Sequence, residues 1–294
     1  MSGAISKQAF QRLELVHDKV IRVAELRTID KNHDGTITPQ EAASRGIRSN
    51  NDLTALNTNL KRFEGCDPVQ IVFNSDRTVA NPSVNDPREQ QELSQRFGTH
   101  GEKGAMTKTM IKAADIVVGS VGDNAVRDNA QAIKDTAERY NLNPKMIAAI
   151  VYEEMAHQFP PKYEDGIVCA VKENRCSMGL SQIGAGELIK QGWFASEGIG
   201  PTAPDSSLSA DQLKRARTHL SVPANNLDVL AKKLVRLQNK LGLPPGITNQ
   251  NTYAGAHAIA QLTYLHNGFT DYSPRIAETM RAPHLLNALG KIAP

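Results

Sequence analysis

The chain has 294 residues, of which 40% are hydrophobic and 5% aromatic, and its formal net charge is +3. This length suits one large or two modest domains, with a buried core that needs no disulfide framework. The mild charge and the scattered basic residues exclude a dense phosphate-binding surface, so nucleic acid is not an expected partner.

Hydrophobic periodicity predicts a mainly helical chain. Apolar residues at three- and four-residue steps favour an amphipathic helix over 5–29, and a second helix is expected from Pro39. Residues 64–104 lack this pattern and carry three prolines, so they are interpreted as a linker with one short strand at 69–73. Further helices are predicted at 125–140, 144–158, 184–192, 208–219, 224–241 and 250–266, followed by short pieces in 274–290 that break at Pro283.

The loop at residues 30–41 reads DKNHDGTITPQE and has the spacing of a calcium loop. Calcium takes six to eight oxygen ligands, and a twelve-residue loop supplies them from positions 1, 3, 5, 7, 9 and 12, with glycine at position 6. The match resembles the EF-hand family residue by residue. The resulting ligand set for Ca²⁺ is Asp30, Asn32, Asp34, the Thr36 carbonyl, Thr38 and Glu41.

The calcium loop stands alone in the sequence, and two interpretations of it remain. A single loop favours a structural metal site, because EF-hand sensors work in pairs and the seven methionines are dispersed rather than gathered in a groove. The other interpretation is a calcium sensor, which calcium-induced exposure of apolar surface would reveal. An acidic loop that matches by accident is the alternative to both.

Two glutamates, Glu153 and Glu154, end an apolar helix with the sequence IAAIVYEEMAHQF. Apolar surroundings raise the pKa of a carboxyl group because desolvation disfavours its charged form, and a general acid needs that property. Taken alone, the pair is better interpreted as two exposed glutamates on a polar helix face.

A second motif follows, SMGLSQI at residues 177–183, and Gly179 lies 25 residues after Glu154. With this separation the chain resembles the goose-type lysozyme and soluble lytic transglycosylase superfamily, in which a Tyr-x-Glu run precedes Ser-x-Gly-Leu-Met-Gln-Ile. The resemblance covers 145–270 and implies a lysozyme-like catalytic domain within a mainly α chain. It selects Glu154 as the catalytic acid. It also implies substrate contacts from Ser177, Gly179, Leu180 and Gln182.

The third family motif, Ala-Tyr-Asn-Ala-Gly, has a partial match at residues 264–268, YLHNG. Tyr264 is expected to be a hydrogen-bonding neighbour of Glu154, with a tyrosine at the edge of the core as the alternative. The chain departs from the family at Met155, where Ser or Thr is common.

The resemblance implies cleavage between N-acetylmuramic acid and N-acetylglucosamine, by one of two routes. A hydrolase of inverting geometry needs a second carboxylate ~6.5–9.5 Å from the acid. The candidates are Asp165 and Glu173, with Glu164 beside them. A lytic transglycosylase needs no second carboxylate, because a hydroxyl of the substrate attacks and leaves a 1,6-anhydro end. Three acids in one loop favour the hydrolase.

The expected domains are a helical region with the EF-hand-like loop and a linker at 1–104, and the lysozyme-like domain at 105–294. No stretch approaches the ~20 apolar residues of a membrane span, and the N-terminus lacks the apolar region of a signal peptide. We therefore expect synthesis in the cytoplasm. Cys169 and Cys176 either pair in an oxidising compartment or stay ordinary thiols.

A wall-cutting enzyme without an export signal indicates delivery by another route. A calcium loop joined to a muramidase resembles the glycoside-hydrolase effectors of type VI secretion, which implies a toxin that acts in a rival's periplasm. The implied partners are peptidoglycan and an immunity protein that occupies the cleft. A phage endolysin is the alternative enzyme, and a calcium-dependent wall-binding module is the alternative without catalysis.

Overall fold

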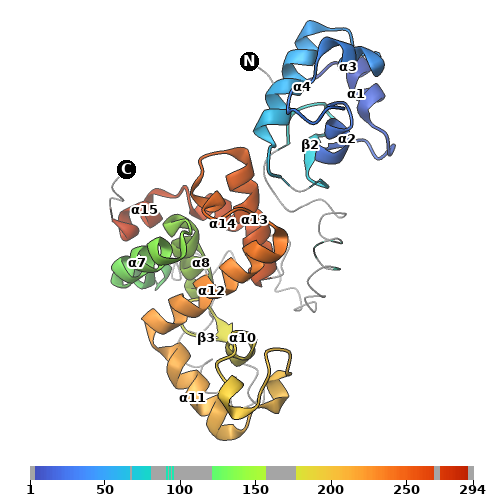
Figure 1. Cartoon of the computed structure of the whole chain (residues 1–294). Coiled ribbons are helices and arrows are strands. Elements are labelled where there is room, and N and C mark those ends of the chain that lie inside the picture. Colours follow the sequence, from blue (N-terminus) through green and yellow to red (C-terminus); the bar gives the residue numbers. More distant parts are fainter. Residues whose placement is uncertain are drawn as a thin grey trace. The chain divides into compact units, whose positions relative to one another are not determined.

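The computed structural model describes residues 4–66, 68–80, 91, 93, 95, 121–156, 177–267 and 272–290 (Figure 1). The described residues are mainly helical, as predicted. Among them no helix is both long and apolar enough to cross a membrane. The chain forms two compact units: unit 1 is Met1–His100 with Gln250–Ser273, and unit 2 is Gly101–Asn249 with Pro274–Pro294. The predicted division at residue 104 differs from this grouping, because it assigns 250–273 to the second domain.

Unit 1 is a small helical body with a two-stranded antiparallel sheet, in which Ile21 of β1 lies opposite Phe73 of β2. Tyr253 attaches the late helix α13 to it. The Tyr253 ring lies 3.7 Å from the Phe63 ring between centroids, and its hydroxyl donates to the Ala80 carbonyl at 3.0 Å. The elements are α1 Lys7–Leu13, β1 Ile21–Arg22, α2 Val23–Arg27, α3 Pro39–Ser44, α4 Asn50–Arg62, β2 Ile71–Phe73 and α13 Tyr253–Asn267.

The first helix is shorter than predicted. The prediction of one helix over 5–29 is wrong, because α1 ends at Leu13 and α2 begins only at Val23. His17 has a φ of 60°, which no right-handed helix contains. The Glu25 carboxylate accepts the Leu15 N–H at 2.8 Å, so a side chain ten residues away satisfies the backbone where the helix stops.

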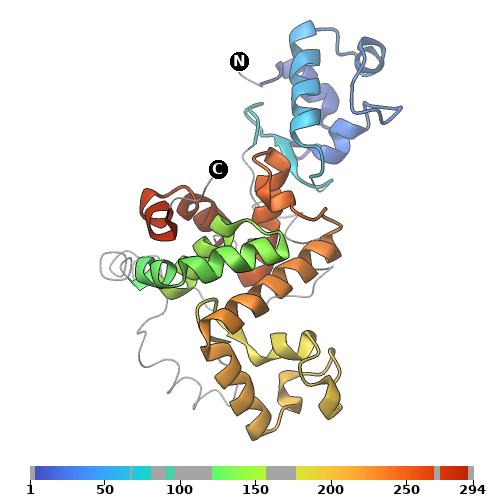
Figure 2. The ribbon, with the colours of Figure 1, turned by 60° about the vertical axis from the view of Figure 1, so that its left-hand side comes forward.

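Unit 2 is built around α8, an apolar helix whose residues from Met146 to Val151 are fully buried. Asn143 begins this helix by accepting the Lys145 N–H at 2.9 Å, as an N-terminal cap does. Helices α7 and α15 pack on α8, and α7 also runs beside α12 (Figure 2). The elements are α7 Ala130–Tyr140, α8 Pro144–Ala156, β3 Ser177–Met178, β4 Ile183–Gly184, α10 Ala185–Lys190, α11 Ala210–Ser221, α12 Pro223–Leu241 and α15 Pro283–Leu289, with α14 Tyr272–Thr279 crossing from unit 1.

Most of the other predicted elements are confirmed within a few residues. Pro39 opens α3 and Pro144 opens α8, as the preference of proline for the first helical turn predicts. The predicted strand at 69–73 is β2, and Pro283 begins α15 as the expected break.

Candidate functional site

The loop at 30–41 is closed by its own side chains. The two Asp30 carboxylate oxygens accept the N–H groups of Asp34 at 3.2 Å and Gly35 at 2.9 Å. Gly35 has a φ of 81°, which favours glycine at this turn. Asp30 is buried, whereas residues 31–36 are exposed. The loop therefore has a fixed first residue and a solvent-facing middle.

Glu41 joins the two ends of this loop. One carboxylate oxygen accepts the Lys31 N–H at 2.9 Å, and the other accepts the Thr38 N–H and hydroxyl, both at 2.8 Å. The hydrogen bonds from Thr38 hold the pKa of Glu41 below its usual value. The twelfth residue of the loop is thus brought back to its start as an anion.

Asn57, on α4, supports the loop from outside, and sequence analysis missed it. Its side-chain oxygen accepts the Ile37 N–H at 2.7 Å, and its amide donates to the Ile37 carbonyl at 2.9 Å. Ile37 is the buried apolar residue at position 8 of the loop. One carboxamide therefore satisfies both backbone groups of the residue that attaches the loop to the core.

The predicted calcium ligands have the right chemistry, and they are only partly assembled. Asp30, Asp34 and Glu41 supply carboxylate oxygens from one short loop. Among the described residues, however, no three His, Cys, Asp or Glu side chains lie together as a group that would hold a metal ion. In this arrangement the carboxylate oxygens bind N–H groups of the loop instead.

The neighbouring glutamates of α8 have different surroundings. Glu153 is buried with 5% exposure, and it accepts the Thr279 hydroxyl at 2.6 Å and pairs with Arg275 at 3.2 Å. Glu154 is half-buried. Glu153 therefore links α8 to α14, whereas Glu154 is partly accessible to solvent.

The SMGLSQI motif forms a β-hairpin, with β3 and β4 paired antiparallel and Gly179–Gln182 as the turn. Gln182 has a φ of 47°, and its side-chain amide donates back to the Gly179 carbonyl at 2.9 Å. Leu180 is buried, and Ser177 is the first residue of β3. The turn is thus held by one of the residues that was expected to bind substrate.

Asn226, on α12, holds the hairpin turn in place. Its side-chain oxygen accepts the Ser181 N–H at 2.9 Å and the Ser181 hydroxyl at 2.6 Å. A Cβ at Gly179 would come within 2.3 Å of the Asn226 amide nitrogen, and the Gly179 φ is 72°. Packing against α12 therefore gives a physical reason for this glycine, where the sequence suggested close approach of a sugar.

Helix α12 carries one residue that interacts with each of the two predicted motifs. Asn226 binds Ser181 of the turn, and the charge of Lys233 interacts with the carboxylates of Glu187 and Glu154. Lys233 follows Asn226 by seven residues, so the two residues lie on the same face of α12, about 10 Å apart along the axis.

The charges around Lys233 come from three helices. Burial lowers the pKa of Lys233 to about 8, although Glu187 and Glu154 oppose that change and Lys190 and Arg236 add to it. Glu187, on α10, also accepts two hydrogen bonds from Arg236, at 2.7 and 2.8 Å. Lys233 thus interacts with charged side chains of both signs on α8, α10 and α12.

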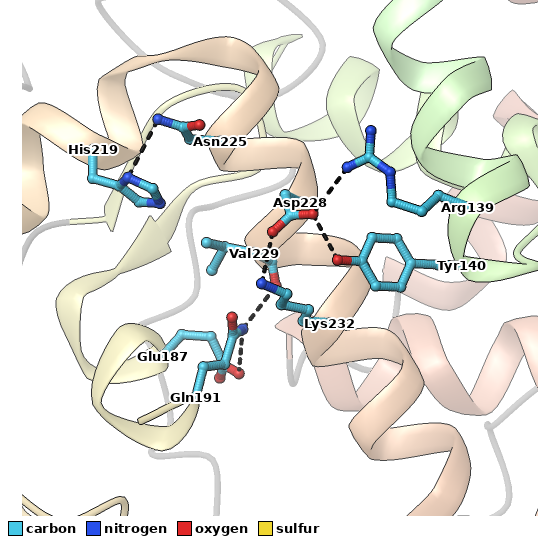
Figure 3. Close-up of polar contacts among 9 residues, drawn as sticks. All are labelled: Arg139, Tyr140, Glu187, Gln191, His219, Asn225, Asp228, Val229 and Lys232. Carbon is cyan, nitrogen blue, oxygen red and sulfur yellow. Dashed lines mark hydrogen bonds and ion pairs between the residues drawn. The ribbon is translucent and has the colours of Figure 1, made fainter. Parts of the chain in front are cut away.

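A second polar cluster ties α7 to α12 (Figure 3). Asp228 accepts the Tyr140 hydroxyl at 2.6 Å and pairs with Lys232 at 2.9 Å and Arg139 at 3.3 Å. Burial alone would raise the pKa of Asp228, but the hydrogen bonds from Tyr140 and Lys232 outweigh it and hold the value below the usual range. This cluster fixes the position of the helix that carries Asn226 and Lys233.

The remaining predicted site residues are not brought to this face by the described contacts. Tyr264 is buried in α13, which belongs to unit 1. Asp165 and Glu173 lie outside the described residues, as do Cys169 and Cys176. Asn226 and Lys233 were missed by sequence analysis. The available signal was a polar residue, Asn226, among the buried apolar residues of an amphipathic helix, with Lys233 seven residues further on.

Comparisons with protein-family models, curated proteins and solved structures gave no match to this chain.

Proposed function

We propose that the chain is a muramidase of lysozyme-like fold that cleaves peptidoglycan strands between N-acetylmuramic acid and N-acetylglucosamine. Glu154 is its catalytic acid. The observation that carries this proposal concerns one face of α12, where Asn226 binds the motif turn Gly179–Gln182 and Lys233 interacts electrostatically with the half-buried carboxylate of Glu154. Cleavage of a glycosidic bond needs a proton donor of this kind and polar groups that bind the sugar.

In the proposed reaction, the Glu154 carboxyl gives its proton to the glycosidic oxygen as the bond to the anomeric carbon breaks. The sugar gains oxocarbenium character, and either water or a hydroxyl of the substrate then attacks the anomeric carbon. Attack by water releases a proton to a second carboxylate, for which Asp165 and Glu173 remain the candidates. Attack by the substrate hydroxyl gives the anhydro product of a lytic transglycosylase, the alternative activity.

Replacement of Glu154 tests the proposal. We expect Glu154→Gln to abolish release of soluble muropeptides from purified sacculi while the melting temperature stays unchanged, because the amide keeps the shape and carries no transferable proton. Glu138→Gln, at an exposed position on α7, is the matched control and retains activity. Full activity of Glu154→Gln would exclude Glu154 as the acid. Mass spectrometry of the wild-type products separates the two routes, since anhydro ends weigh one water less.

We further propose that the loop at 30–41 binds Ca²⁺ and stabilises unit 1. The support is the ligand spacing, together with the closure of the loop by Glu41 and the support from Asn57. Binding requires the carboxylates of Asp30, Asp34 and Glu41 to turn from N–H groups toward a shared cation. A ligand that binds only the folded state at 100 times its Kd stabilises that state by about 2.7 kcal/mol. We expect chelation to lower the melting temperature, and an unchanged temperature together with unchanged wall digestion would contradict the proposal.

We also propose that the enzyme is an antibacterial toxin that acts in the periplasm of a target cell and is blocked by an immunity protein in the cleft. Calcium is scarce in the cytoplasm, so the loop would link full stability to delivery. A comparison of the wild-type chain with the Glu154→Gln variant tests this proposal as well. The wild-type chain directed to the periplasm of a test bacterium is expected to lyse it, and the variant is not.

A further inference from the structure

Trp193 is the sole tryptophan of the chain, and it is 39% exposed. It lies three residues after the end of α10, and its N–H donates to the Leu188 carbonyl at 3.0 Å, which fixes its backbone. The next residue, Phe194, is fully buried and meets the Trp193 ring edge-on, with 4.9 Å between centroids. Phe194 therefore packs in the core, whereas the larger ring of Trp193 lies partly outside it.

His219, on α11, lies beside the exposed ring. The centroids of Trp193 and His219 are 4.9 Å apart, with an angle of 33° between the ring planes. The Asn225 amide donates to His219 Nδ1 at 3.2 Å (Figure 3), which places the imidazole proton on Nε2 when the ring is neutral. Trp193, His219 and Asn225 form what we call the aromatic platform, an apolar surface edged by neutral donors and acceptors.

The aromatic platform is linked through the backbone to the residue that holds the turn of the proposed site. Asn225 directly precedes Asn226, which holds Ser181 of the turn and also donates to the Leu220 carbonyl at 3.1 Å. His219 directly precedes Leu220. One corner, where α11 meets α12, therefore positions both the aromatic platform and the turn.

We propose that the aromatic platform is a saccharide-binding subsite that stacks on an N-acetylhexosamine ring of the glycan strand. The proposal rests on the proposed function, because it assigns one further sugar of the same substrate. A pyranose offers a face of C–H groups to an aromatic ring, and its hydroxyl and acetamido groups suit hydrogen bonds with an imidazole and a carboxamide. The ligand is expected to be uncharged at this point, because the nearby ions Arg215 and Glu197 already pair with each other at 2.6 Å.

The size of the surface favours a sugar over a protein partner. Within the described part of unit 2, the exposed large apolar side chains are Trp193 and Val222. A stable protein interface covers about 800 Å² on each partner, which these side chains do not supply. One or two sugar rings match a platform of this kind, in which a few polar groups orient the ligand on apolar surface.

The sole tryptophan makes the test specific. The full-length Glu154→Gln variant is titrated with chitin tetrasaccharide and hexasaccharide while tryptophan emission is recorded. We expect a saturable change in emission, because the only emitting indole lies in the subsite. Calorimetry on the double variant Glu154→Gln/Trp193→Ala is expected to show about tenfold weaker binding, and Trp193→Phe is expected to recover part of the loss.

Leu15→Ala, at an equally exposed apolar residue in unit 1, is the matched control and keeps full affinity. The subsite is overturned if tryptophan emission does not respond to saturating saccharide, or if Trp193→Ala binds as tightly as the control while retaining its melting temperature. Wall cleavage by the wild type together with either result leaves the proposed function standing without the subsite. A tryptophan response without any wall cleavage has the opposite meaning, that the subsite exists and the enzyme assignment fails.

Discussion

The loop at 30–41 of unit 1 and the surroundings of Glu154 in unit 2 are both polar sites, and they are assembled in opposite ways. In the loop, Asp30 and Glu41 bind backbone groups no more than ten residues away. Glu154, on α8, interacts electrostatically with Lys233, which lies on α12, 79 residues further along the chain. The first site is made by local spacing, and the second is made by packing.

The contrast shows that a short sequence motif is enough to shape the loop at 30–41, whereas the surroundings of Glu154 depend on how distant helices pack. A loop closed by its own side chains needs one outside partner, and Asn57 supplies it. The acid site instead depends on α12 being held at the correct place by Asp228, Asn226 and Glu187. We therefore expect substitutions in unit 2 to act over longer sequence distances than substitutions around the loop.

The largest expected effect comes from Glu153, whose partner Thr279 lies 126 residues away. Glu153→Ala removes a buried carboxylate and leaves the Arg275 charge and the Thr279 hydroxyl without it. Breaking a buried ion pair costs about 3–5 kcal/mol, and partial exposure of Arg275 reduces this to about 2–3 kcal/mol. Urea unfolding measures the loss of stability. Glu154→Ala, one residue away and half-buried, is the control and is expected to cost less than about 1 kcal/mol.

An equal loss of stability in the two variants would contradict the assignment of separate roles to these neighbours. It would mean that both glutamates hold the helices together, and it would weaken the case for Glu154 as an accessible acid. A large loss of stability in Glu153→Ala, without one in Glu154→Ala, would show that Glu153 holds distant helices together and that Glu154 does not.

The helices and the loop at 30–41 could be predicted from the sequence more completely than the surroundings of Glu154. Helix α8 was predictable because a run of apolar residues and an opening proline are local signals. The β3–β4 hairpin was not predicted, because its two strands have only two residues each. The break after Leu13 was not predictable, because apolar spacing continues through it and the stop depends on Glu25 reaching back to Leu15. Lys233 and Asn226 were missed for the same reason. Their roles exist only after α8, α12 and the hairpin have packed.

The next effect concerns Lys233, and it depends on pH. Burial lowers its pKa to about 8, below the ordinary value of 10.5. Between these two values the unfolded chain holds a proton that the folded chain has lost, so this residue makes stability rise with pH in that window. Below pH 8 both states are protonated, and the folded state carries the full cost of the buried charge.

We therefore expect Lys233→Met to be more stable than the wild type at pH 7, by about 1–3 kcal/mol. The difference should shrink as the pH rises from 8 toward 10.5. Urea unfolding at several pH values measures it. Lys233→Arg, which stays charged throughout, is the control and should lack this pH dependence. A constant difference between wild type and Lys233→Met across the window would mean that the ammonium group is not desolvated.

The smallest effect belongs to Asn57, a residue of α4 that supports the loop at 30–41 from outside. Asn57→Ala removes both hydrogen bonds to Ile37. Each such bond contributes about 1 kcal/mol, so the free loop becomes more mobile and must be ordered when calcium binds. We expect about tenfold weaker calcium binding by calorimetry, with a small loss of melting temperature in chelator. Thr58→Ala, at the next and exposed position of α4, is the control. Calcium affinity equal to that of the control would mean that the loop orders its ligands without Asn57. The loop would then be assembled by local contacts, in contrast to the surroundings of Glu154.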